Sequence, residues 1–170
     1  DNIYGLNYLN AIIGRMYSSL LFADLREKNN LVYSVSSDID TYEHSGIFMI
    51  YCEMDSKNFY KVLKRILVVL NNVRKNGISN ANFRKIRKSA RNTLVNVDND
   101  SSSLAEYRGK QYLYKNKTFT DNEIIKKYLA VSLNDVNKIA RKVIDFKQMN
   151  ILAQGELSER RILNMAKSYL

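Results

Sequence analysis

The chain has 170 residues, the length of one ordinary domain or at most two very small ones. Apolar residues make up 45% of it and charged residues 26%, which excludes a disordered or fibrous protein and predicts a single hydrophobic core. No apolar run is long enough for a membrane-spanning helix, so no membrane span is expected. The lone cysteine, Cys52, excludes an internal disulfide, which favours a reducing compartment such as the cytoplasm.

The net charge of +10 suggests an acidic partner such as nucleic acid, anionic lipid or an acidic peptide. Composition offers a plainer explanation, because abundant Asn, Lys, Ile and Tyr without Pro or Trp is typical of an AT-rich genome. The basic residues are interleaved with acids and never form a run of five. We therefore favour diffuse solvated charge and expect no nucleic-acid partner. The basic stripe of one later helix is interpreted in the same way: Arg84, Arg87, Lys88 and Arg91.

The first predicted element is an amphipathic helix that ends at residues 25–28. Its apolar stripe recurs at helical spacing and comprises Leu6, Leu9, Ile13, Met16, Leu20 and Leu25. Gly14 interrupts this stripe at a cost of about 1 kcal/mol relative to Ala, so it is expected to mark a close approach of the backbone. Asn29 and Asn30 tolerate left-handed geometry and are predicted to end the helix.

Two strands follow. Residues 32–42 alternate in polarity and predict a strand with one buried and one wet face. The face expected to be buried holds Tyr33, Val35, Ile39 and Thr41, and the wet face holds Ser34, Ser36, Asp38 and Asp40. Residues 43–46 are interpreted as the turn. Residues 47–54 are apolar on both faces, which predicts a more central strand of the same sheet.

The remainder is predicted to be mostly helical. Asp55, Ser79, and the capping-box pairs at 103–106, 120–123 and 132–135 predict helix starts, and Gly77 predicts a helix end. Residues 148–154 are expected to form a short strand, followed by a last helix over 158–169. Because strands and helices are segregated, we expect an α+β fold: an antiparallel sheet packed on one side by several helices, in one domain over residues 1–170.

Residues that could carry chemistry are few. A hydrolytic zinc site needs three protein ligands, and this chain has one histidine, His44, which is expected in the turn. Cys52 lies in a predicted strand and is interpreted as a core thiol. No glycine-rich phosphate loop is present. We therefore expect no metal site, no bound cofactor and no catalytic residue in this chain alone.

Arg26 and Tyr33 remain, at one predicted helix-to-strand corner. An arginine in a last helical turn is favourable because of the helix dipole, and a tyrosine at a strand start usually serves packing. Alternatively, the guanidinium and the phenol converge on one carbonyl oxygen and stabilise an oxyanion. Their spacing alone does not decide between these interpretations.

Residues 13–35, IGRMYSSLLFADLREKNNLVYSV, resemble the opening of the C-terminal homologous domain of the M16 zinc peptidases, the pitrilysin, insulinase and mitochondrial processing peptidase type. The family pattern reads roughly Leu-Gly-Gly-Gly-Met-Ser-Ser-Arg-Leu-Phe, then Arg-Glu-Lys-Arg-Gly-Leu-Ala-Tyr-Ser-Val. The matching residues are Ser18, Ser19, Leu21, Phe22, Leu25, Arg26, Glu27, Lys28, Leu31, Tyr33, Ser34 and Val35, continued by Tyr42, Ser45, Gly46 and Phe48. Residues 100–112 and 132–136 are similar to later family segments.

This resemblance implies that the two halves of an M16 enzyme have different roles. M16 enzymes enclose a peptide between two related halves, of which the N-terminal half carries the zinc and its glutamate base. The C-terminal half lacks metal and completes the chamber. By this resemblance Arg26 and Tyr33 contact the substrate, this chain alone is inactive, and zinc lies in a missing N-terminal half. The implied partners are a peptide or unfolded protein and the N-terminal domain or a partner subunit, and a homodimer stays open.

The chain also departs from the family pattern. Residues 11–14 replace most of a glycine run, Tyr17 looks inserted, and Asn29-Asn30 stands for Arg-Gly. The family usually has a strand before the first helix, so we expect this chain to be a fragment of a longer protein. Two alternatives stay open: a non-catalytic M16-like scaffold subunit, and a basic α+β module that binds nucleic acid.

Overall fold

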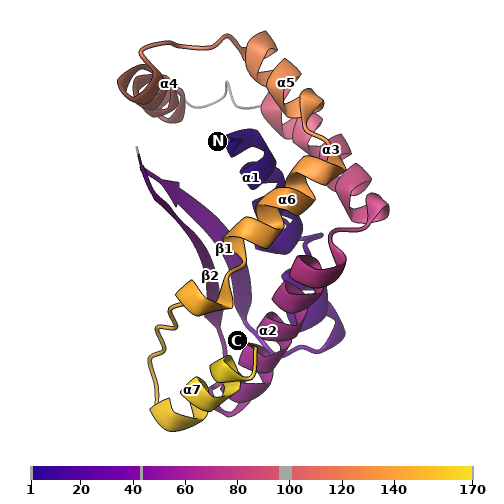
Figure 1. The fold of residues 1–170 in the computed structure, drawn as a ribbon, viewed down its shortest axis with the longest axis vertical. Coiled ribbons are helices and arrows are strands. Elements are labelled where there is room, and N and C mark those ends of the chain that lie inside the picture. Colours follow the sequence, from indigo (N-terminus) through magenta and orange to yellow (C-terminus); the bar gives the residue numbers. More distant parts are fainter. Residues whose placement is uncertain (1, 43, 96–100, 170) are drawn as a thin grey trace.

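The computed structural model describes residues 2–42, 44–95 and 101–169 (Figure 1). A helical segment comes first, then a β-hairpin, then a series of helices. The hairpin strands are β1 (Ser34–Thr41) and β2 (Gly46–Glu53). The α-helices are α1 (Ile3–Asn10), α2 (Phe59–Asn76), α3 (Asn80–Val95), α4 (Ser101–Lys115), α5 (Asp121–Ala130), α6 (Leu133–Val143) and α7 (Glu159–Lys167).

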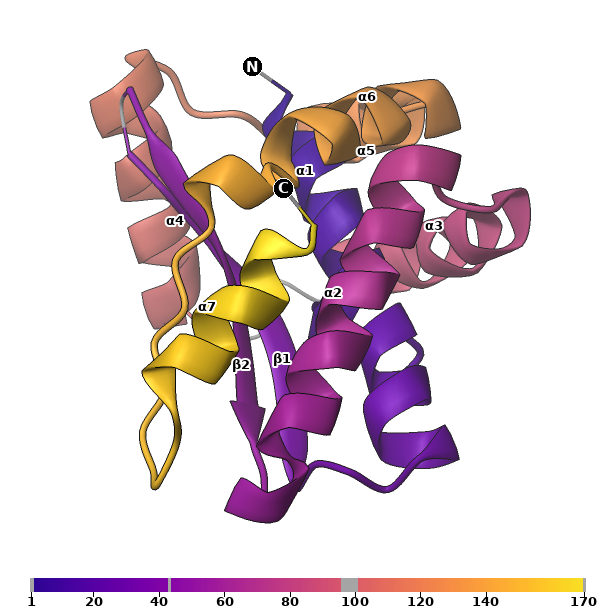
Figure 2. The ribbon, with the colours of Figure 1, turned by 60° about the horizontal axis from the view of Figure 1, so that its bottom comes forward.

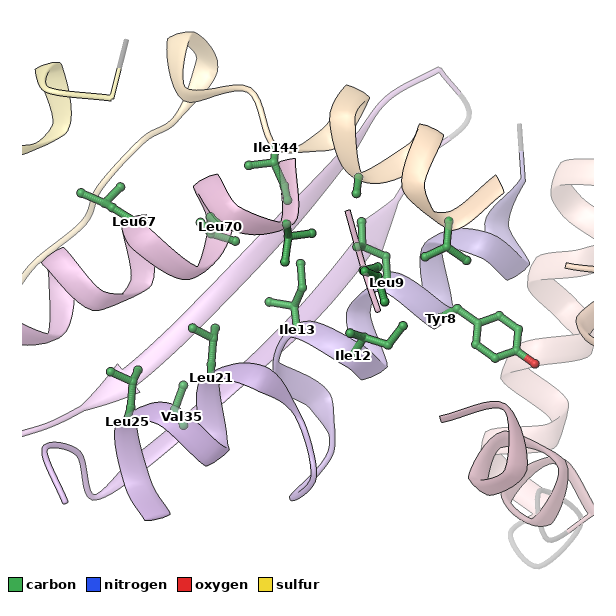
Figure 3. Close-up of a cluster of buried hydrophobic side chains, with 14 of the residues drawn as sticks. Tyr8, Leu9, Ile12, Ile13, Leu21, Leu25, Val35, Leu67, Leu70 and Ile144 are labelled. Carbon is green, nitrogen blue, oxygen red and sulfur yellow. The ribbon is translucent and has the colours of Figure 1, made fainter. Parts of the chain in front are cut away.

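The predicted α+β fold with an antiparallel sheet is confirmed. The two strands pair in register from Ser34 opposite Glu53 to Thr41 opposite Gly46. In Figure 2, α2 and α6 lie to the right of the hairpin, and α7 crosses in front of β2. The core lies between the hairpin's inner face and the helices, and Figure 3 shows Val35 of β1 beside Leu21 and Leu25. No described helix combines the length and the apolar character needed to cross a membrane.

The first helical segment is broken, so the prediction of one continuous helix is wrong. Helix α1 passes into a π-helical stretch, η1 (Ala11–Arg15), and the chain becomes extended at Met16. A second π-helical stretch, η2 (Phe22–Lys28), follows, and the Ser19 hydroxyl accepts a hydrogen bond from the Phe22 amide before it. Ile13 and Leu25 are nonetheless both fully buried. An apolar stripe indicates which side chains will be buried, but it does not indicate whether the helix is continuous. The break allows the apolar side chains on both sides of it to reach the core.

Gly14 allows the predicted close approach. A Cβ atom at Gly14 would lie 2.6 Å from the Ser37 hydroxyl oxygen and 2.8 Å from the Ser37 backbone nitrogen. Beside this contact, the buried Ser37 hydroxyl donates a hydrogen bond of 2.5 Å to the Asn10 side-chain oxygen. The glycine therefore lets η1 lie directly against β1.

The hairpin follows the predicted alternation, with two exceptions. Val35 is buried, and the four predicted wet-face residues Ser34, Ser36, Asp38 and Asp40 are not. Tyr33 and Thr41, both assigned to the buried face, are exposed, Tyr33 with 68% of its surface. The prediction of a central position for β2 is also wrong, because within the described ranges β2 pairs only with β1. A strand becomes central only when a second strand bonds its other edge.

The helix starts agree well with the capping signals. Thr120 with Glu123, and Ser132 with Asp135, form complete capping boxes at α5 and α6. Gly77 ends α2 with φ of 76°, a left-handed value that suits glycine. Asp55 caps a 3-10 turn, η3 (Ser56–Asn58), which leads into α2. Helix α4 begins at Ser101, before the predicted cap at 103, and the Ser103 side chain lies outside the described part of the structure.

The predicted strand over 148–154 does not form. A 3-10 turn, η5 (Phe146–Gln148), covers its start, and residues 149–154 have no regular structure. Leu152 is completely exposed, and no backbone hydrogen bond joins these residues to β2 in the described chain. An apolar sequence becomes a strand only when a neighbouring strand bonds its backbone groups, and no strand in the described ranges does so here. The predicted last helix is confirmed as α7, which Ser158 caps.

The first helix packs against helices far along the chain. A Cβ atom at Gly5 of α1 would lie 2.5 Å from the Ile139 Cδ1 atom of α6, so the two helices lie closely together. The Asn7 side-chain amide donates a 2.7 Å hydrogen bond to the Tyr128 hydroxyl of α5. Tyr128 also packs edge-on against Tyr4 and Tyr8.

Candidate functional site

The helix-to-strand corner around Arg26 and Tyr33 is built by a left-handed helix end. Asn30 has φ of 47°, and the Leu31 amide bonds the Leu25 carbonyl at 2.8 Å. The Asn29 side chain donates a 2.6 Å hydrogen bond to the Asp24 carbonyl. Asn29 and Asn30 are predicted to end the helix because asparagine tolerates left-handed geometry. Asn30 adopts that geometry, and the helix ends at this pair.

The Arg26 guanidinium lies across this corner. Its Nη1 donates a 2.6 Å hydrogen bond to the carbonyl oxygen of Val32, the residue directly before Tyr33. No other hydrogen bond of this guanidinium occurs among the described residues, and Arg26 is exposed. Since an arginine has five N–H donors, four remain for a ligand or for water.

Tyr33 is fixed through its backbone and exposed through its side chain. The Tyr33 amide donates a 2.7 Å hydrogen bond to the Glu53 carbonyl at the end of β2. The next residue, Ser34, adds a 3.0 Å bond from its hydroxyl to the Glu53 carboxylate. With 68% of its surface exposed, the phenol stands at the open end of the hairpin.

The 3-10 turn η3 also contacts this corner. Its Asn58 side-chain amide donates a 3.3 Å hydrogen bond to the Leu31 carbonyl. Lys57 pairs with Asp55 at 2.9 Å, and this bond raises the pKa of Lys57. A smaller contribution to that pKa comes from the Tyr33 phenol, so Lys57 and Tyr33 lie within electrostatic reach of each other.

The structure thus brings Arg26 and Tyr33 to one corner, without a hydrogen bond between their side chains among the described contacts. The guanidinium carries N–H donors and the phenol an O–H donor. Sequence reasoning missed Asn58 and Lys57. The available signal was the predicted hairpin itself, since antiparallel pairing returns the residues after β2 to the start of β1.

The other sequence candidates lie elsewhere. His44 lies between β1 and β2, as predicted for a turn residue. Cys52 of β2 is half-buried and packs against the core, as expected of a core thiol, and burial raises the pKa of that thiol to about 12. Arg84, Arg87 and Lys88 are exposed, and Arg87 donates a hydrogen bond to the Leu129 carbonyl at the end of α5. The Arg91 side chain lies outside the described part.

The described residues offer no ligand set for zinc. No group of three His, Cys, Asp or Glu side chains that could hold a metal ion occurs among them. The residues of this chain that the structure shows therefore do not fit a zinc centre of their own.

Comparison with known proteins defines the class. Residues 1–90 match the family model described as the peptidase M16 inactive domain. An uncharacterized zinc protease of Bacillus subtilis, YmxG, is 32% identical over 143 residues, which cover 84% of this chain and 35% of that protein. The chain spans about a third of the length of the curated relatives it matches.

Solved structures agree with this assignment. A conserved protein from Enterococcus faecalis superposes with a TM-score of 0.72 at 26% identity, over 84% of this chain and 33% of that one. A peptidase M16 inactive domain from Pseudomonas fluorescens superposes with a TM-score of 0.73 at 18% identity, over 83% and 34% of the two chains, which shows the shared fold. This chain belongs to the peptidase M16 family, and more than half of it matches the family's inactive domain.

Proposed function

We propose that this chain is the non-metal half of a zinc endopeptidase, which closes the chamber and binds the peptide substrate. A zinc site in another domain or subunit would supply the hydrolytic chemistry, and this chain alone would be inactive. The relatives named as zinc proteases, and their greater length, support this assignment. The observation that carries it is the bond from the Arg26 guanidinium to the carbonyl directly before Tyr33, whose own side chain is exposed.

The two side chains suit the binding of a peptide carbonyl. The Arg26 guanidinium keeps donors free beyond its bond to Val32, and the Tyr33 hydroxyl is exposed. A carbonyl oxygen gains negative charge when the peptide bond is attacked, and fixed donors bind that oxygen more tightly than the ground-state oxygen. The chain's own contribution would therefore be to orient the peptide and to support the oxyanion.

The test uses the full-length protein that includes the zinc half. Arg26→Ala and Tyr33→Phe should each raise the barrier for peptide cleavage by roughly one to four kcal/mol, measured as kcat/KM. Tyr112→Phe and Arg84→Ala are matched controls, because they change exposed residues on α4 and α3, away from the corner. Wild-type rates in both corner variants would overturn the proposed role and favour a non-catalytic scaffold subunit.

A further inference from the structure

The backbone directly before the Tyr33 side chain is held at three successive residues by three different elements. Asn58 of η3 bonds the Leu31 carbonyl at 3.3 Å, and Arg26 of η2 bonds the Val32 carbonyl at 2.6 Å. The Tyr33 amide bonds the Glu53 carbonyl of β2 at 2.7 Å. The segment therefore has a fixed position although its side chain is exposed.

Asn58 is itself rigidly placed. The Asn58 amide bonds the Asp55 carbonyl at 2.9 Å, and the Asp55 carboxylate accepts the Lys57 amide at 3.0 Å. Helix α2 begins at the next residue, Phe59. The side-chain amide of Asn58 is thus presented from a short turn that is held at both ends.

We propose that Asn58 is a positioning residue for Tyr33: it anchors the Leu31 carbonyl so that the phenol stands where the substrate oxygen binds. This inference rests on the proposed function of the corner. Arg26 also has a second role in this scheme. The guanidinium that would bind the substrate also fixes the Val32 carbonyl, directly before Tyr33. Asn58 touches no substrate in this scheme and acts only through the backbone of residues 31–33.

The inference has a kinetic consequence. Without the Asn58 bond, residues 31–33 keep their other two anchors, so the fold should persist while the phenol samples more positions. Donors that stabilise a transition state lose much of their effect when they are displaced by about 1 Å. The loss should therefore appear in kcat more than in KM, and only while the Tyr33 hydroxyl is present.

The experiment is a double-mutant cycle in the full-length protein that includes the zinc half. Asn58→Ala should lower kcat/KM about three- to tenfold, the effect of one lost hydrogen bond. Asn58→Asp, nearly the same shape, places an acceptor against the Leu31 carbonyl and should lower it at least as much. In a Tyr33→Phe background, Asn58→Ala should cause no further loss.

Asn137→Ala is the matched control. The Asn137 side chain accepts a 2.8 Å hydrogen bond from the Ile78 amide, beyond the opposite end of α2 from Asn58. Helix α2 has 18 residues, so it separates the two sites by about 27 Å. We expect a decrease in melting temperature similar to that of Asn58→Ala, with kcat/KM unchanged.

The outcomes separate the two proposals. If Tyr33→Phe slows cleavage but Asn58→Ala and Asn58→Asp do not, or if the Asn58 and Tyr33 effects multiply, the positioning role is wrong and the proposed function stands. If Tyr33→Phe cleaves at the wild-type rate, the proposed function fails and the positioning role fails with it. Losses in both Asn58 variants that disappear in the Tyr33→Phe background, with an active Asn137→Ala control, support the inference.

Discussion

Arg65 of α2 binds Asp24 of η2 through two parallel hydrogen bonds, Nε to Oδ2 at 2.7 Å and Nη2 to Oδ1 at 2.6 Å. The Asp24 side chain is 21% exposed and that of Arg65 is 35% exposed. The pair joins the π-helical stretch before the candidate site to the helix after it. Because the geometry is bidentate and partly shielded from water, it should matter more than a simple surface ion pair.

Arg65→Ala is therefore expected to lower the free energy of unfolding by about 1–3 kcal/mol, since it leaves the Asp24 carboxylate partly buried without its partner. Urea unfolding followed by circular dichroism measures this. Lys110→Ala is the control, because it removes one member of a well-exposed pair with Glu106 on α4. Equal stability losses in the two variants would show that the bidentate geometry contributes nothing special.

Gly14→Ala should be strongly destabilising. The new methyl group would meet the Ser37 backbone nitrogen at 2.8 Å, and backbone cannot move aside as a flexible side chain can. We expect a loss of about 1–3 kcal/mol, typical of overpacking, measured by thermal unfolding. Gly109→Ala on α4 is the matched control: nothing lies within 4 Å of its added methyl group, so it should stabilise by up to about 1 kcal/mol. A Gly14→Ala variant as stable as wild type would contradict the close contact.

Cys52 should react slowly with thiol reagents in the folded protein. Burial raises the pKa of its thiol to about 12, and only the thiolate is nucleophilic. At pH 8 the thiolate fraction should be roughly one part in ten thousand when folded, against about a quarter when unfolded. Alkylation should therefore accelerate at least about a hundredfold in denaturant. Ser36→Cys, on the exposed face of β1, should react rapidly without denaturant, and a native Cys52 that matches its rate would disprove the assignment.

The capping box at α6 predicts a pH effect. The Ser132 hydroxyl and backbone amide lower the pKa of the Asp135 carboxyl. Since the folded pKa lies below the unfolded value of about 3.9, the contribution is complete above that value and is lost as the pH falls through the folded pKa. Ser132→Ala should cost about 1 kcal/mol at pH 7, and its difference from wild type should shrink as the pH falls through the lowered pKa of Asp135.

Ser158→Ala provides the control for that titration. Ser158 caps α7 by accepting the Arg161 amide, so no carboxylate partner stands at the third helical position. Its stability difference from wild type should stay the same on acidification. Urea unfolding at pH 7 and pH 3 compares the two variants, and parallel behaviour of both would count against the role of Asp135.

Features encoded locally were predictable from the sequence. The two confirmed capping boxes each join residues three apart, and Gly77 and Asn30 adopt the left-handed geometry that their side chains allow. The corner formed by Arg26 and Tyr33 was predictable for a related reason, since only a short turn separates the helix end from the strand start. Whether these two residues bind a substrate is still a prediction.

Features decided at long range were not predictable. Asn58 bonds a carbonyl 27 positions earlier: the predicted hairpin brings its segment back to the start of β1, but no local pattern indicates this particular bond. The apolar stripe of residues 6–25 is compatible with a continuous or a broken helix, because both bury it. Residues 148–154 have the composition of a strand, but a strand also needs a neighbour, which periodicity does not reveal.

The hydrogen bond from Asn7 to Tyr128 joins positions 121 residues apart and has a consequence for biosynthesis. Helix α1 leaves the ribosome long before α5 and α6, which pack against it in the folded chain. The part of α1 that these two helices cover must therefore wait for them during translation. In a nascent chain, α1 would reach its complete native environment only after most of this segment has been made.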